Sequence, residues 1–338
     1  EGATIVVPQL PEDVPGLDEL EDRRQKLKDL IASLHFTDAG NGIKKCTTGK
    51  GQLLLAANVQ AALEYKGIGG EALVKTGLKF IRRQIPGGKY YYLVNHSAKA
   101  VDATIPLNLS AAAVLIMDPQ SGEYGRAASA LSGGKTMVHV QMQPGEALIL
   151  KATVAGLQTA AWKYIEKTAT PVTLAGEWKL HFTNGGPVLP ADRILTVLGS
   201  WTNAQDTATA SFSGTGVYST AFDLTAAMAP DYLLDLGKVC ESAHVYVNGK
   251  DAGICWSIPF SARVGRYLKP GKNILTIEVC NLMANRIRYM DQNGIPWRKY
   301  HEINFVNINY KPFDASKWDI MPSGLIGPVT LTPLTTKP

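Results

Sequence analysis

The sequence is poor in cysteine and has no metal-binding motif. Its four cysteines, Cys46, Cys240, Cys255 and Cys280, lie far apart and form no C-x-x-C pair. This spacing argues against a structural zinc site and against a disulfide-stabilised scaffold. We expect small buried thiols, with one bridge among the last three left open, and neither a metal nor a cofactor.

Long apolar runs and basic clusters are also missing. No apolar run approaches the roughly 20 residues that a membrane-spanning helix needs. Hydrophobic residues make up 45% and charged residues 19% of the 338 residues, a globular balance. The net charge of +5 is spread along the chain, and the basic pairs Lys44-Lys45 and Arg82-Arg83 lack interleaved aromatic residues. We therefore expect no membrane span and no nucleic-acid partner.

The length predicts several domains, because single cores seldom exceed roughly 250 residues. Residues 1–76 alternate strand and helix twice, and the second helix is expected to begin at the N-cap Asn58 and end at Gly67. Two such units predict the end of a Rossmann-like α/β domain with a parallel sheet. The chain starts with Glu1 followed by a strand-like run, so we expect it to be processed or cut from a longer one.

From residue 77 the periodicity changes to that of strands. LKFIRRQI, the turn PGG and KYYYLVNHS predict a hairpin. Further strand-like runs follow at 101–108, 113–118, 136–142 and 146–151. Residues 77–152 are therefore expected to form a small β-sandwich. Residues 153–170 are interpreted as a linker, either helical or extended.

Residues 171–338 show the clearest alternation. In EWKLHFTN, the side chains of Trp178, Leu180 and Phe182 are expected on one face, as in a half-buried antiparallel strand. VYSTAFDL, YLLDLG, AHVYVNG and NILTIEVCN add strands joined by turns rich in Gly, Pro and Asn. This pattern predicts a jelly-roll β-sandwich, so the fold class of the whole chain is mainly β.

The segment HVYVNGKDAGICWSIPF predicts a tight β-hairpin. Asn248-Gly249 suits a turn that needs positive φ, and Gly253 is expected to permit a close backbone approach. We expect Trp256 and Trp201 in the core or at the edge of the sandwich.

These strands resemble known modules. DLGKVCESAHVYVNGKDAGICWSIPF and YLKPGKNILTIEVCNLMANRI are similar to the galactose-binding-like sandwich of many glycoside hydrolases, including the sugar-binding domain of family 2. A longer set resembles the C-terminal region of α-L-rhamnosidases of glycoside hydrolase family 106: LAGEWKLHF, LGSWT, FSGTGVYSTAF, LDLGKV, Asn285-Arg286-Ile287, SGLIGPV and the upstream LKFIRRQIPGGKYYYLVN. The resemblance covers most of residues 50–338.

The resemblance implies that this chain is the non-barrel, C-terminal half of such an enzyme. In that family the catalytic (β/α) barrel, with its acid and base glutamates, precedes the region seen here, so no catalytic residue is carried over. The resemblance also implies two partners, a rhamnose-containing glycan and the upstream catalytic domain of the same polypeptide. It further implies a periplasmic or extracellular location.

The residues themselves offer no catalytic pair. A glycosidase needs two carboxyl groups about 5 to 10 Å apart, whereas Glu177, Asp235, Glu278 and Glu302 are scattered along the sequence. We expect Asp235 to cap a turn and Glu278 to point outward from a strand. The six histidines have no G-x-S-x-G context that would indicate a serine hydrolase. The fragment alone is therefore expected to be inactive.

The long loop expected from Asn285 to Ser323 is the best candidate for a functional site. Sugars are bound by aromatic faces together with planar polar side chains, and a connection of this length is usually functional or docked on another domain. It supplies both kinds of side chain at Asn285, Arg286, Trp297, Arg298, Tyr300, His301 and Trp318. Sugar binding and packing against a neighbouring domain both stay open.

A different class of protein is the alternative for the whole chain, namely a stand-alone carbohydrate-binding protein. Barrel-like βα repeats encoded upstream of Glu1 would favour the enzyme, and a signal peptide directly before Glu1 would favour the binder.

Overall fold

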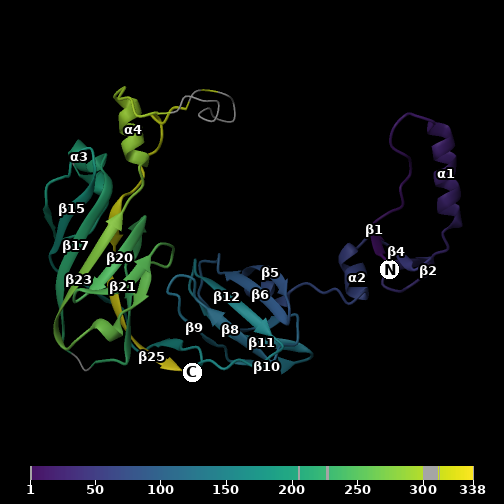
Figure 1. The fold of residues 1–338 in the computed structure, drawn as a ribbon, viewed down its shortest axis with the longest axis horizontal. Coiled ribbons are helices and arrows are strands. Elements are labelled where there is room, and N and C mark those ends of the chain that lie inside the picture. Colours follow the sequence, from purple (N-terminus) through teal and green to yellow (C-terminus); the bar gives the residue numbers. More distant parts are fainter. Residues whose placement is uncertain (1, 205, 226–227, 300–310, 312, 338) are drawn as a thin grey trace. The chain divides into compact units, whose positions relative to one another are not determined.

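The computed structural model describes residues 2–204, 206–225, 228–299, 311 and 313–337. The chain divides into two compact units, residues 1–71 and residues 72–338. Figure 1 shows their helices and strands and labels many of them.

The first unit is built on one small mixed sheet. Its elements are β1 (Thr4–Val7), α1 (Leu20–Ser33), β2 (Thr37–Asp38), β3 (Ile43–Thr48), β4 (Gly51–Ala56) and α2 (Val59–Tyr65). The strand order is β1-β4-β3-β2. The predicted cap is confirmed, since Asn58 Oδ1 accepts a hydrogen bond from the Ala61 amide at 3.2 Å. Gly67, just past α2, has the expected left-handed φ of 70°.

The predicted parallel sheet is only partly right. β1 pairs with β4 in parallel, but β4 with β3 and β3 with β2 are antiparallel. β3 was not predicted, because Lys44 and Lys45 make that stretch look polar. The turn between Thr48 and Gly51, with Gly49 at a φ of 56°, is too short for a crossover, and such a turn joins only antiparallel strands.

The second unit begins with the small β-sandwich. Its elements are η1 (Ala72–Thr76), β5 (Lys79–Ile85), β6 (Gly88–Val94), β7 (Val101–Leu107), β8 (Ala113–Met117), β9 (Tyr124–Arg126), β10 (Ser129–Ser132), β11 (Lys135–Met142) and β12 (Ala147–Thr153). The sheets β5-β6-β12-β8-β9 and β10-β11-β7 enclose a core that includes Tyr91, Ile105 and Leu150. The predicted hairpin is confirmed as β5 and β6.

An extended strand follows the small sandwich. β13 (Tyr164–Lys167) pairs antiparallel with the C-terminal strand β25 (Thr330–Lys337), so this part of the linker is extended rather than helical. The Tyr164 side chain packs into the core of the small sandwich. Its hydroxyl donates to the His139 carbonyl and accepts from the Ala128 amide, both at 3.0 Å. One short strand therefore serves both sandwiches.

The C-terminal sandwich holds the largest core. Besides β13 and β25, its elements are β14 (Val172–Thr173), β15 (Trp178–Gly186), β16 (Arg193–Leu195), η2 (Trp201–Asn203), α3 (Thr207–Ala210), β17 (Ser213–Leu224), β18 (Asp231–Asp235), β19 (Lys238–Cys240), β20 (Ser242–Val247), β21 (Lys250–Cys255), β22 (Ser261–Arg263), η3 (Gly265–Tyr267), β23 (Gly271–Cys280), α4 (Ala284–Gln292) and β24 (Gly324–Gly327). Its two large sheets are β16-β15-β17-β23-β20-β21 and β13-β25-β18-β22, with β14 also pairing with β25. The chain is thus mainly β, as predicted.

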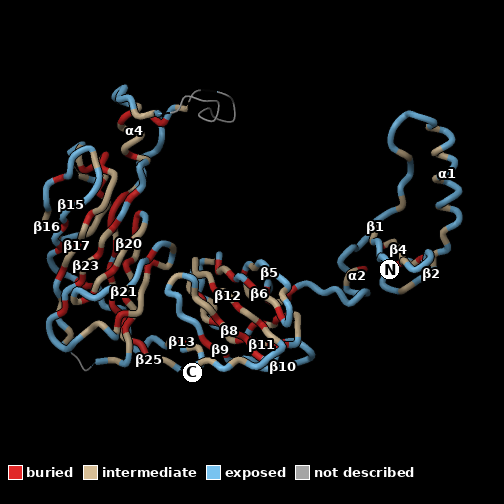
Figure 2. Tube along the Cα trace, viewed as in Figure 1, coloured by how far each residue is buried: buried red, intermediate tan, exposed pale blue. Residues whose placement is uncertain are grey.

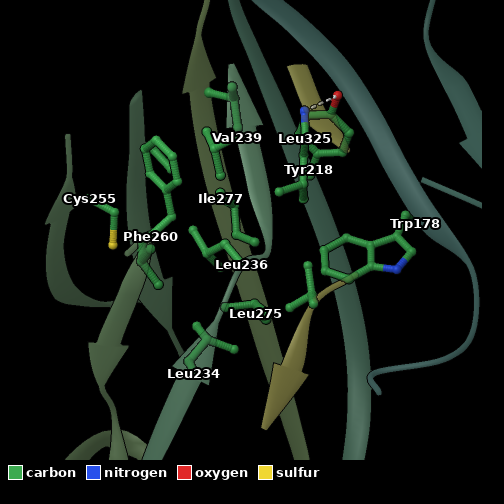
Figure 3. Close-up of a cluster of buried hydrophobic side chains, with 14 of the residues drawn as sticks. Trp178, Tyr218, Leu234, Leu236, Val239, Cys255, Phe260, Leu275, Ile277 and Leu325 are labelled. Atoms are coloured by element: carbon green, nitrogen blue, oxygen red, sulfur yellow. Dashed lines mark hydrogen bonds between the residues drawn. The ribbon is translucent and has the colours of Figure 1, made fainter. Parts of the chain in front are cut away.

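Alternation of side chains accounts for this core. Trp178, Leu180 and Phe182 are all at most 2% exposed, as predicted for one face of a strand. Figure 3 shows Trp178, Tyr218 and Leu325 within the same cluster of buried side chains. In Figure 2 buried residues gather on the strands of the two sandwiches, whereas α1 has none.

The hairpin of β20 and β21 has the predicted turn, with Asn248 at a φ of 52° and Gly249 at 75°. The predicted close approach at Gly253 is wrong, because a Cβ there would meet no atom within 4 Å. Its φ of 105° instead accompanies a register shift between Val245 and Tyr246, where the strand bulges. Trp256, at the edge of this sheet, is 56% exposed.

Two predictions from the sequence concern the cysteines and a membrane-spanning helix. All four cysteines are free, and all except Cys280 are buried. Burial raises the pKa of the Cys255 thiol to about 12. Within the part of the chain that the structure describes, no helix is long and apolar enough to cross a bilayer.

Candidate functional site

The segment predicted as one long loop begins as a helix. Asn285 and Arg286 lie in the first turn of α4, which runs nine residues. The sequence ANRIRYMDQ contains neither Gly nor Pro and is rich in residues that favour helices. Gly294, with a φ of 62°, follows the helix end and lets the chain turn away.

Asn285 fastens the return of this segment to the sandwich. Its side chain is buried, and its amide nitrogen donates to the Met321 carbonyl at 2.6 Å and to Ser323 Oγ at 3.2 Å. Its Oδ1 accepts from the Met321 amide at 2.9 Å. Because both its donor and its acceptor groups are engaged, the predicted sugar-binding residue Asn285 positions the segment here.

Asp291 organises the chain beyond α4. Its carboxylate accepts hydrogen bonds from Trp297 Nε1 at 2.7 Å and from the Ala315 amide at 2.8 Å, and it pairs with Arg298 Nη2 at 3.3 Å. Burial acts to raise the pKa of Asp291, but these hydrogen bonds and the Arg298 charge outweigh it, so the pKa lies below its ordinary value. An ionised Asp291 therefore holds three separate parts of the segment together.

An aromatic cluster adjoins Asp291 through Trp297. The ring of Phe313 lies edge-on to Trp297 at 5.8 Å and to Trp318 at 5.4 Å. The Arg298 guanidinium lies 5.5 Å from the Trp297 ring and 5.6 Å from the Phe313 ring, a cation–π arrangement. Trp318 is 40% exposed. The fold thus brings the predicted residues Trp297, Arg298 and Trp318 together.

Some predicted residues lie elsewhere and some were missed. The Arg286 guanidinium lies over the Tyr289 ring at 5.7 Å, while Tyr300 and His301 lie outside the described residues. Phe313 was not predicted as a site residue. It is aromatic and lies within the same predicted segment as Trp297 and Trp318, so the sequence could have indicated it.

Arg288, also missed, ties α4 to the aromatic cluster. Its Nε donates to the Trp318 carbonyl at 2.8 Å and its Nη1 to Gln292 Oε1 at 3.2 Å. The Gln292 amide in turn donates to the Ser316 carbonyl at 2.9 Å. These bonds fix the backbone that carries Trp318.

A pocket of about 290 Å³ lies where η2 and α3 face α4. Its lining is mixed polar and apolar: Thr202, Ala204, Asp206, Thr207, Ala210, Ser211, Asn285, Arg288, Tyr289, Gln292 and Ile320. Asp206 caps α3 by accepting from the Thr209 amide at 2.7 Å and pairs with Arg193. No local sequence pattern indicates this side of the pocket, since only folding brings α3 to α4.

Two of the carboxylates considered as catalytic candidates, Asp235 and Glu278, lie where their contacts belong to the β-sandwich itself. Asp235 Oδ1 accepts from the Gly237 amide at 2.9 Å and caps a turn, as predicted. Glu278 faces His244 across the β20 and β23 pair and is partly exposed, while Glu302 lies outside the described residues. In the described part of the chain, no three His, Cys, Asp or Glu side chains gather as metal ligands would.

Comparisons with known proteins find similarity to enzymes that hydrolyse glycosides. A rhamnosidase from Novosphingobium sp. PP1Y matches 92% of this chain with a TM-score of 0.67 and 27% identity, over 29% of its own length. The putative β-glucuronidase of Formosa agariphila is 31% identical over 192 residues, 51% of this chain and 16% of that protein. No family model matches. The chain spans a minor part of each relative, and it is related to the glycoside hydrolases.

Proposed function

We propose that this chain is the C-terminal accessory region of an α-L-rhamnosidase-like enzyme and that the α4 segment, meaning the described residues between 284 and 323, contacts its carbohydrate. The observation that carries the proposal is the rhamnosidase similarity, which extends over 92% of the chain. Because that extent exceeds either sandwich alone, it supports the same succession of modules along the chain rather than one common module.

The α4 segment has the surface chemistry that a sugar needs. Trp318 is partly exposed, and its position is fixed by Phe313 and by the Arg288 bond to its carbonyl. Sugars offer apolar C–H faces to such rings and hydroxyl groups to polar side chains. Rhamnose also carries a methyl group, which favours an aromatic contact. The polar side chains among the residues that line the pocket beside α4 offer the second kind of contact.

The catalytic step belongs, in this proposal, to an upstream domain of the same polypeptide. The covered share of the rhamnosidase is 29% of its length, so most of that enzyme has no counterpart in this chain. We propose a periplasmic or extracellular site of action on a rhamnose-containing glycan.

Titration of the chain with rhamnose-containing oligosaccharides tests the sugar contact. We expect heat or NMR shifts at millimolar ligand and a loss of roughly 3- to 10-fold in affinity for Trp318→Ala, the usual worth of one aromatic contact. Trp256→Ala is the matched control, because Trp256 is also exposed but directly follows the end of β21 and is not part of the α4 segment. An unchanged affinity in Trp318→Ala, or the same loss in Trp256→Ala, would contradict the sugar contact.

An assay with aryl glycosides tests the enzymatic assignment. We expect the chain alone to release no aglycone and the product of the complete gene to hydrolyse an aryl α-L-rhamnoside. A complete gene product that hydrolyses only aryl β-glucuronides would refute the rhamnosidase assignment. A gene that encodes a signal peptide directly before Glu1 and no barrel would support a stand-alone carbohydrate-binding protein instead.

A further inference from the structure

The pocket between α3 and α4 contains one positive charge that nothing in the pocket balances. Asp206 and Arg288 are its charged lining residues. Asp206 is already neutralised by Arg193 and also caps α3. Across the described residues, Arg288 forms no ion pair, because its two hydrogen bonds go to the carbonyl oxygens of Trp318 and Gln292.

The surrounding charges do not cancel Arg288. Asp291, three residues further along α4, is paired with Arg298. Lys317 and Asp319 carry opposite charges and are both exposed beside Trp318. A single guanidinium in a concave site attracts an anion more strongly than the same group on an open surface.

The pocket also has uncommitted hydroxyl groups. Among the described residues, neither the Tyr289 hydroxyl nor the Thr207 hydroxyl has a hydrogen-bond partner, although both residues line the pocket. By contrast, Ser211 Oγ donates to the Thr207 carbonyl at 2.8 Å, and Thr202 Oγ1 is bonded to Ser200 Oγ at 2.6 Å. The groups left for a ligand are thus one cation and two hydroxyls, beside the apolar side chain of Ile320.

The volume of the pocket limits the size of the ligand that it can hold. Small-molecule sites usually begin at about 300 Å³, and this pocket, at about 290 Å³, lies at that lower end. It therefore suits a single sugar ring.

We propose that this pocket binds a sugar that carries a carboxylate, a hexuronate, with Arg288 contacting the carboxylate and Tyr289 and Thr207 contacting ring hydroxyls. A planar guanidinium matches a planar carboxylate better than it matches a neutral hydroxyl. The inference rests on the proposed function only in that a glycan supplies the ligand, and it names an acidic sugar as part of that glycan.

Titration of the chain with methyl D-glucuronoside and with the neutral methyl D-glucoside tests the pocket. We expect the acidic sugar to bind at least roughly tenfold more tightly, as a charge-assisted hydrogen bond implies, and to weaken as salt is added. Arg288→Gln is expected to abolish this preference. Arg286→Gln is the matched control, because Arg286 lies on the same helix but does not line the pocket.

A second variant covers the case in which Arg288→Gln disturbs the segment. Tyr289→Phe removes one hydroxyl and keeps the ring that lies under Arg286, so we expect both sugars to bind severalfold more weakly with an unchanged melting temperature. Equal affinity for the two sugars, a preference that survives Arg288→Gln, or loss of the preference in Arg286→Gln would overturn the proposal. Equally tight binding of a glucose sulfate would refute its carboxylate selectivity.

The two proposals fail in different experiments. Binding of rhamnose-containing oligosaccharides that depends on Trp318, without any binding of the glucuronoside, rejects the acidic-sugar pocket alone. Binding of the glucuronoside that depends on Arg288, together with no rhamnoside hydrolysis by the complete gene product, rejects the rhamnosidase assignment alone.

Discussion

Glu146 provides a test of the small sandwich through pH. It lies in the turn between β11 and β12, where its carboxylate accepts a hydrogen bond from the Gln143 amide at 2.6 Å. Burial raises the pKa of Glu146 from 4.5 to about 7, with the nearby Asp118 carboxylate adding to the rise and the Gln143 hydrogen bond opposing it. The folded state therefore favours the protonated acid.

The size of the effect follows from the pKa difference between the folded and the unfolded chain. One pKa unit corresponds to about 1.4 kcal/mol, so a rise from 4.5 to about 7 corresponds to about 3 kcal/mol. Below pH 4.5 both states hold the proton and no stability is lost. Between pH 4.5 and about 7 the unfolded chain releases its proton first, so the free energy of unfolding falls as the pH rises.

Glu146→Gln removes this ionisation and keeps an oxygen that accepts the Gln143 hydrogen bond. We expect the variant and the natural chain to be about equally stable at low pH, with the variant about 3 kcal/mol more stable well above the raised pKa. Hydrogen exchange of the β6 and β12 amides across a pH series reports on this sandwich alone. A stability difference that is independent of pH, or a variant that is less stable at high pH, would refute the reasoning.

Three further variants test the C-terminal sandwich. Gly324→Ala should lower the melting temperature strongly, because Gly324 has a φ of 93° and a Cβ there would meet Tyr218 Oη at 2.6 Å. Tyr218→Phe should cost roughly 2 to 4 kcal/mol in urea unfolding, since the buried Trp201 Nε1 and Leu325 N–H groups lose their acceptor. Asp291→Ala should speed hydrogen exchange in the α4 segment and shift tryptophan fluorescence; unchanged exchange would contradict its anchoring role.

Strand alternation made much of the fold predictable. It is strongest where one face is buried and the other faces solvent, as at Trp178, Leu180 and Phe182. It failed at β3, where adjacent lysines break the apolar pattern, and at α4, whose few apolar residues gave no helical stripe.

The candidate site was predictable only where its members are close in sequence. Trp297, Arg298 and Trp318 share one segment, so composition alone could single them out. The face of the pocket at Thr207 comes from a distant part of the chain, and no local pattern links it to Arg288. The structural role of Asn285 could not be predicted from the sequence either, because a side-chain amide can form hydrogen bonds with a sugar hydroxyl or with a backbone carbonyl.

Tyr164 has a practical consequence for dividing this protein. A truncation that ends before Tyr164 would leave a hole in the hydrophobic interior of the small sandwich. A truncation that starts after Lys167 would remove β13, the neighbour of β25, and would leave the N–H and C=O groups of that edge of β25 unpaired and prone to self-association. Limited proteolysis should therefore spare Tyr164–Lys167 and yield a resistant product that begins near Ala72, where the second compact unit starts.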